Sequence, residues 1–110
     1  MEQLILPEKP TFKDFQHYVH QLENERGFLD DNVLQKCLLL GEEIGELFKT
    51  IRKDIGVKVD NDSRFKNIEH ELADILVILC TIANRYKIDL EKAFREKEEI
   101  NKKRVWEKDK

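Results

Sequence analysis

The stretch from Ile75 to Ala83 constrains the fold most, because it would be apolar nearly all round a helix. A helix without a polar face has to be buried on every side. A chain of 110 residues has enough material for only a modest core. We therefore expect an oligomer, a homodimer or homotetramer, in which this helix is central. The same run is too short to span a membrane.

The composition favours an all-α fold, because four Gly and two Pro supply few β-turns. Residues 1–110 suit a single domain. Capping boxes at Thr11 with Asp14 and at Asn32 with Gln35 mark the first two helix starts. The apolar spacing predicts four main helices, completed into a bundle by dimerisation: the first from Thr11 to Gly27, then Val33–Arg52, Asp62 or Ser63 to Tyr86, and Leu90–Glu107. The remaining segments read as an N-terminal arm (1–10) and a loop (54–63).

Two short acidic clusters stand inside the apolar helical sequence, and five carboxylates make them up: Glu42, Glu43, Glu46, Glu71 and Asp74. Glu71 and Asp74 share the helical stripe of Ile78. An Arg or Lys from another helix could neutralise such acids, but few basic residues stand at inward positions. A bound cation is the simpler explanation, because an unpaired buried charge is costly. Oxygen ligands alone favour Mg²⁺, with Mn²⁺ as the alternative, over Zn²⁺.

The last helix carries a polar group on its apolar stripe, formed by Lys97, Asn101 and Arg104 within the arc of Phe94. Two interpretations remain open. The helix end leaves the core and its long side chains reach solvent, or these side chains bind a polyphosphate. An Mg²⁺ ion bound by carboxylates keeps coordination positions open for water and for substrate phosphates. This suits metal-assisted hydrolysis of a phosphoanhydride bond. The sequence has no Walker-type loop.

Charge and cysteine content narrow the class of protein further. The net charge is −3 and no basic patch dominates the body of the chain, so nucleic acid is not an expected partner. Cys37 and Cys80 both stand in apolar helical runs, which is typical of free thiols in a reducing, cytoplasmic protein. Residues 1–10 lack the pattern of a signal peptide. We expect neither a membrane span nor a secreted protein.

The order of these motifs resembles the all-α nucleotide pyrophosphohydrolases, the MazG-like group. The resemblance rests on Glu42-Glu43-x-x-Glu46, then Glu71-x-x-Asp74, then Lys97-x-x-x-Asn101-x-x-Arg104-x-Trp106. It implies Mg²⁺-dependent cleavage between the α and β phosphates of a nucleoside triphosphate, which gives a monophosphate and pyrophosphate and serves nucleotide-pool house-cleaning. It also implies helical dimers or tetramers whose sites are walled by more than one subunit.

The resemblance also implies roles for individual residues. The metal ligands would be Glu43, Glu46, Glu71 and Asp74, while Glu42 would hold a second metal or orient the attacking water. Lys97, Asn101 and Arg104 would meet phosphate or sugar. Phosphoribosyl-ATP pyrophosphohydrolases and all-α dUTPases or dCTPases share this chemistry and remain alternatives. A helical dimerisation module without enzymatic activity is the other alternative, and it would tolerate Glu71→Gln.

Overall fold

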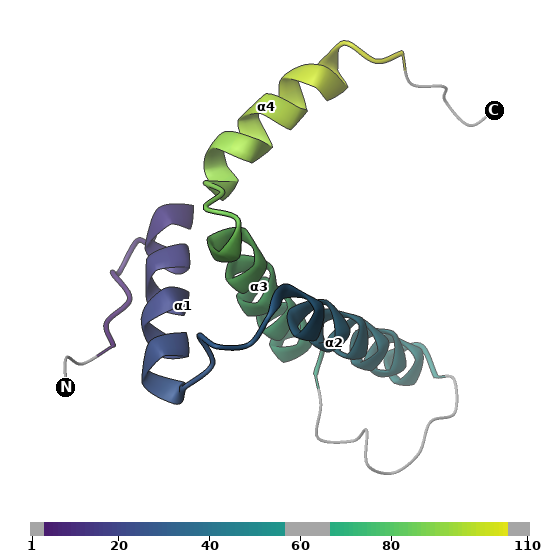
Figure 1. The fold of residues 1–110 in the computed structure, drawn as a ribbon. Helices are drawn as coiled ribbons and strands as arrows, with labels where there is room; N and C mark the ends of the chain where they lie inside the picture. The colour runs from purple at the N-terminus through teal and green to yellow at the C-terminus, as the bar shows by residue number, and fades with distance from the viewer. Residues whose placement is uncertain (1–3, 57–66, 106–110) are drawn as a thin grey trace.

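The computed structural model describes residues 4–56 and 67–105, which form four α-helices and no strand (Figure 1). The all-α prediction is confirmed. Residues 4–10 of the predicted arm carry no helix or strand, and residues 1–3 lie outside the described residues. Most of the predicted 54–63 loop lies outside the described residues, and Asp54 itself ends a helix. No described helix is long and apolar enough to cross a membrane.

Helix α1 (Phe12–Arg26) begins and ends where the sequence predicts. The Thr11 amide donates to the Asp14 carboxylate at 2.8 Å, and the Asp14 amide donates to Thr11 Oγ1 at 3.2 Å. These reciprocal bonds satisfy amides that the first helical turn leaves unpaired. Gly27 ends the helix with φ +77°, a left-handed conformation that favours glycine.

Helix α2 (Val33–Asp54) is the longest and begins at the second capping box. The Asn32 amide donates to Gln35 Oε1 at 2.7 Å, and the Gln35 amide donates to Asn32 Oδ1 at 2.9 Å. The helix continues two residues beyond the predicted end at Arg52. Gly56 follows with φ +87°, a left-handed conformation that favours glycine just after a helix.

Helix α3 (Ile68–Arg85) begins later than predicted, since the sequence favoured a start near Asp62 or Ser63. The boundary has a local cause. Asn67 has an extended backbone, and its Oδ1 accepts from the His70 amide at 2.8 Å, as an N-cap residue does.

Helix α4 (Leu90–Lys102) begins at the predicted Leu90, and Asp89 is its N-cap, because Asp89 Oδ1 accepts from the Lys92 amide at 3.1 Å. Its predicted end at Glu107 is wrong. The amides of Lys103 and Arg104 donate to carbonyls three residues back, at 3.2 Å each, so the last turn tightens and the helix stops.

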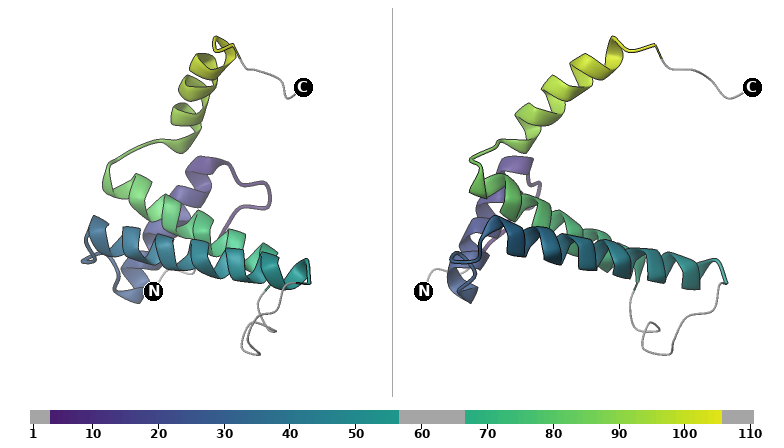
Figure 2. Two further views of the ribbon diagram at one scale, coloured as in Figure 1. Left: turned by 90° about the vertical axis from the view of Figure 1, so that its right-hand side faces the viewer. Right: turned by 45° about the vertical axis from the view of Figure 1, so that its right-hand side comes forward.

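Helix α3 lies at the centre of the chain, where it packs along α2 on one side and against α1 on another. The hydrophobic core consists of Val19 and Leu22 from α1 and Cys80 from α3. Figure 2 shows α2 and α3 alongside each other, while α4 leads away from that pair. Large apolar side chains on α2 and α4 stay exposed in the single chain, among them Leu38 and Phe94.

Gln16 joins α1 to the turn between α3 and α4. Its Nε2 donates to Asn84 Oδ1 at 3.2 Å and to the Ile88 carbonyl at 2.7 Å. Its Oε1 accepts from the Leu90 amide at 3.0 Å. Asn84 returns a bond from Nδ2 to the Gln16 carbonyl at 2.9 Å. This network fixes the direction in which α4 leaves the body of the chain.

Candidate functional site

Three carboxylates of the two acidic clusters come together between α2 and α3. Glu43 projects from α2, and Glu71 and Asp74 project from successive turns of α3. Each offers a carboxylate oxygen, and these oxygens all lie within 4.8 Å of one another. The sequence predicted the i, i+3 pair on α3, and the packing of α2 against α3 adds the third acid.

Burial of Glu71 makes this cluster costly without a cation. Glu71 is 4% exposed, and its Oε2 has no hydrogen-bond partner within the described structure. A buried carboxylate oxygen without a donor loses the free energy of hydration that it has in water. Two further carboxylates nearby add repulsion. The chain's own residues therefore fit a bound cation, which would supply the missing partner.

The cluster opens towards solvent, because Glu43 is half-buried and Asp74 is exposed. The three residues of this cluster offer only carboxylate oxygens as metal ligands, so the cluster suits a hard divalent cation. His70 is close by in sequence, but its Nδ1 lies 3.2 Å from Asn67 Nδ2 at the start of α3. That contact places the histidine at the helix cap.

The other two predicted acids do not join this group. Glu46 is half-buried one turn further along α2, and its carbonyl accepts from Thr50 Oγ1 at 2.9 Å. Glu42 is exposed on α2. The structure thus brings together three of the five predicted carboxylates, and the other two lie near Glu43 on α2.

The predicted phosphate-binding residues belong to α4 and the residues just after it. Figures 1 and 2 show α4, the helix of Lys97 and Asn101, leading away from the α2–α3 pair. Lys97 instead borders a strongly apolar groove, which Leu76, Leu79 and Phe94 also line. Arg104 follows the helix end.

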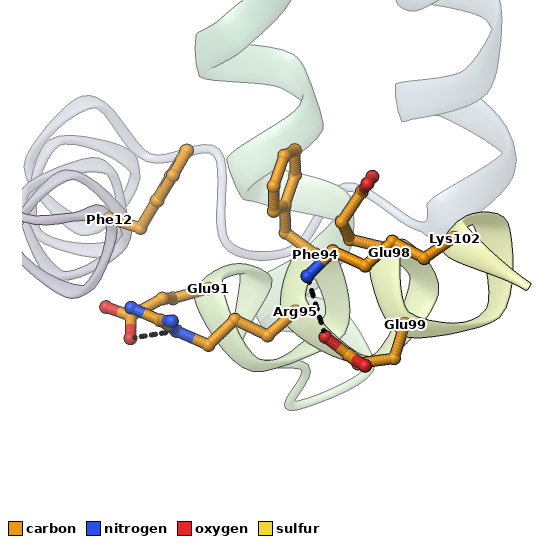
Figure 3. A pocket seen from close by; sticks show the side chains of 7 residues that line it. All are labelled: Phe12, Glu91, Phe94, Arg95, Glu98, Glu99 and Lys102. Carbon is orange, nitrogen blue, oxygen red and sulfur yellow. Dashed lines mark hydrogen bonds and ion pairs between the residues drawn. The ribbon is translucent and has the colours of Figure 1, made fainter.

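A second groove, between the start of α1 and α4, is shown in Figure 3. Phe12 and Phe94 give it apolar walls. Its cations are paired along α4, with Arg95 Nε 3.1 Å from Glu91 and Lys102 Nζ 3.1 Å from Glu99. None of its lining residues comes from α2 or α3. This groove is therefore separate from the carboxylate cluster.

Sequence reasoning missed a buried ion cluster centred on Glu23, a residue that is 1% exposed. Arg85 Nη1 and Nη2 donate to its two oxygens at 3.0 and 2.8 Å, and Lys36 Nζ lies 3.1 Å from Oε2. Burial alone would raise the pKa of Glu23, but the hydrogen bonds and charges of Arg85 and Lys36 outweigh it and lower that pKa. Glu23 and Arg85 are 62 residues apart, so no local spacing could reveal the pair.

Comparisons with known proteins identify the family and the fold of the chain. Residues 31–106 match the family model of the MazG nucleotide pyrophosphohydrolase domain. Two solved structures are similar: YpjD from Bacillus subtilis, described as a candidate pyrophosphatase, and iMazG from Vibrio DAT 722. YpjD is 27% identical with a TM-score of 0.76, over 90% of this chain and 100% of its own. The iMazG chain is 27% identical with a TM-score of 0.63, over 84% and 98% respectively. No curated protein matches the sequence.

Proposed function

The chain belongs to the MazG nucleotide pyrophosphohydrolase family and is an enzyme of that class, and from this premise we propose that it hydrolyses nucleoside triphosphates with Mg²⁺ at the Glu43, Glu71 and Asp74 cluster. The products are a nucleoside monophosphate and pyrophosphate. The observation that carries the proposal is the buried Oε2 of Glu71, which has no partner in the described structure and stands beside two other carboxylates. Mn²⁺ would fit the same oxygen ligands.

Four acids would hold the metal. Glu43, Glu71 and Asp74 converge, and Glu46 lies one turn from Glu43 on α2. The bound ion would neutralise the phosphate oxygens and lower the pKa of a bound water. Glu42, exposed beside Glu43, would hold a second ion or orient the attacking water. Lys97, Asn101 and Arg104 would bind the phosphates or the sugar.

The reaction needs one water. Its oxygen forms a bond to the α phosphorus, and the bond from that phosphorus to the bridging oxygen breaks. Pyrophosphate leaves with the bridging oxygen, and a neighbouring carboxylate takes the proton of the water. Exposure of Asp74 gives substrate a path to the cluster, whereas burial of Glu71 keeps the ligand set out of bulk solvent. The proposed physiological role is nucleotide-pool house-cleaning in the cytoplasm.

We propose that the active enzyme is a homodimer or homotetramer. Two observations support assembly. On α2, Leu34 and Leu38 are each 68% exposed, and on α4, Phe94 is 66% exposed, which is costly for a stable monomer. In addition, α4 leads away from α2 and α3, the two helices that carry the carboxylates (Figure 1). A second copy would cover the apolar faces and bring the cations of its α4 to the cluster.

The proposal is tested by product identification. The protein is incubated with a panel of nucleoside triphosphates, with Mg²⁺ or with excess chelator, and the products are resolved by ³¹P NMR. We expect monophosphate and pyrophosphate in the presence of Mg²⁺ and neither with chelator. Release of inorganic phosphate and a nucleoside diphosphate would contradict cleavage between the α and β phosphates. Turnover of phosphoribosyl-ATP alone, or of dUTP or dCTP alone, would reassign the substrate within the same chemistry.

A further inference from the structure

Helix α2 contributes no side chain to the hydrophobic core of the described structure. That core is formed by α1 and α3, through Val19, Leu22 and Cys80. The two side chains of α2 that are buried are both polar, Lys36 and Thr50. Thr50 donates its side-chain hydrogen bond to a carbonyl of its own helix, and it lines a groove with Asn67 and Ile68 at the start of α3. In addition to the packing of α2 along α3, Lys36 is the buried side chain of α2 that links it to another helix by an ion pair.

Lys36 makes this link through Glu23 of α1. Its Nζ lies 3.1 Å from Glu23 Oε2, and the same carboxylate accepts both hydrogen bonds from Arg85 of α3. Glu23 thus joins a cation of α2 to a cation of α3. Arg85 also donates to the carbonyls of Phe28 and Asp31, at 3.1 and 3.3 Å, in the connection between α1 and α2.

The cluster is better suited to fixing geometry than to adding stability. Burying ions costs hydration, and apolar replacements of buried ion pairs are often as stable as the pairs. A bidentate Arg–carboxylate pair, in contrast, fixes both distance and direction. The cluster holds two cations and two anions, because Lys36 also lies 3.5 Å from the half-exposed Asp31. Glu23, Asp31, Lys36 and Arg85 therefore neutralise one another.

We propose that Glu23 is a positioning residue for the metal site. Together with Lys36 and Arg85, it holds α2 and α3 at the spacing at which Glu43 meets Glu71 and Asp74. Lys36 and Glu43 are seven residues apart, so they lie on one side of α2 about 10 Å from each other. The link matters because the three carboxylates repel one another before a cation binds. This inference rests on the proposed metal site.

The test is the affinity of the metal-free protein for Mn²⁺, measured from the EPR signal of free Mn²⁺ at a temperature where circular dichroism shows every variant folded. Glu23→Gln should weaken binding about 10- to 100-fold, as loss of an outer support does. Val19→Ala is the matched control, because it also loses a buried contact of α1 but leaves the ion cluster intact. Its affinity should stay within about twofold of the wild type.

A second pair of variants covers the case in which Glu23→Gln does not fold. Lys36→Met leaves Glu23 bound to Arg85 and cuts only the link to α2, so it should weaken Mn²⁺ binding. Lys36→Arg keeps a cation beside Glu23 and should restore most of the affinity. Wild-type affinity in folded Glu23→Gln or Lys36→Met would overturn the positioning role. Failure of the wild type itself to bind Mn²⁺ would overturn the metal site, and the inference with it.

Discussion

Glu43 of α2 and Glu71 of α3 offer carboxylate oxygens within 4.8 Å of each other, although one of the two side chains is almost fully buried. Two carboxylates in such an arrangement repel each other unless a proton or a cation stands between them. With a metal bound as proposed, this relationship should couple folding of the α2–α3 pair to metal binding, and the following results are expected.

Replacing Glu71 with Gln should raise the melting temperature of the metal-free protein and remove its response to Mg²⁺. The change deletes a buried charge beside two others. In the wild type, Mg²⁺ at about a hundredfold excess over its Kd should add about 2.7 kcal/mol to the free energy of unfolding. Glu69→Gln, at an exposed acid of the same helix, should keep the wild-type response. Thermal unfolding with Mg²⁺ and with chelator measures both effects, and a full Mg²⁺ response in Glu71→Gln would contradict the site.

Glu23 should give the protein a stability that depends on pH. Its pKa is lowered in the folded state by Arg85 and Lys36, against the opposing effect of burial. The stabilisation is therefore complete above the ordinary value of 4.5 and is lost as pH falls through the lowered folded pKa. Near neutral pH, Glu23→Gln should cost about 3–5 kcal/mol, because it removes the buried carboxylate that pairs with both Arg85 and Lys36. Urea unfolding at several pH values should show that difference shrink in acid, and a constant difference would refute the linkage.

Gln16→Leu should loosen the start of α4. The side chain of Gln16 makes three hydrogen bonds, to Asn84, Ile88 and Leu90. Their loss leaves buried groups unpaired and should lower the free energy of unfolding by about 1–3 kcal/mol. Gln21→Leu, at a half-buried position of the same helix, serves as the control. Faster amide hydrogen exchange at Leu90 in the first variant alone would locate the effect, whereas equal exchange in both would count against it.

Two inactive variants should complement each other if α4 serves a neighbouring subunit. Asp74→Asn damages the metal ligands and Lys97→Ala damages the phosphate-binding helix, so each alone should be inactive. In mixed dimers, one site carries both changes and the other carries neither. Random assortment then restores roughly a quarter of wild-type activity. Pyrophosphate release after co-expression measures this, and the absence of any recovery would place α4 with the carboxylates of its own chain.

The sequence predicts the helices well because the signals that start and stop them are local. Thr11 with Asp14, and Asn32 with Gln35, form the capping boxes that their spacing indicates. Helix α4 ends earlier than predicted for two reasons that are hard to see in a sequence. Beyond Lys102 the backbone amides donate to carbonyls three residues back instead of four. Val105 is 95% exposed, so no apolar packing extends the helix.

Residue spacing predicted the candidate site only where its residues share a helix, and Glu43 was added by the family resemblance. Glu71 and Asp74 stand one turn apart, so their spacing alone indicates a pair. The approach of Glu43 depends on how α2 packs against α3, which periodicity does not fix. The Glu23–Arg85 pair joins α1 to α3 across 62 residues and leaves no trace in local spacing. The cations of α4 follow a family pattern, and their place relative to the acids depends on assembly.

The most direct test of the account is pyrophosphate release from a nucleoside triphosphate by the wild type, Asp74→Asn and Glu69→Gln, each titrated with Mg²⁺. We predict that the wild type and Glu69→Gln show the same saturable dependence on Mg²⁺, and that Asp74→Asn releases no pyrophosphate at any concentration. Wild-type turnover by Asp74→Asn, or release from the wild type in excess chelator, would contradict a metal-dependent pyrophosphohydrolase centred on this carboxylate cluster.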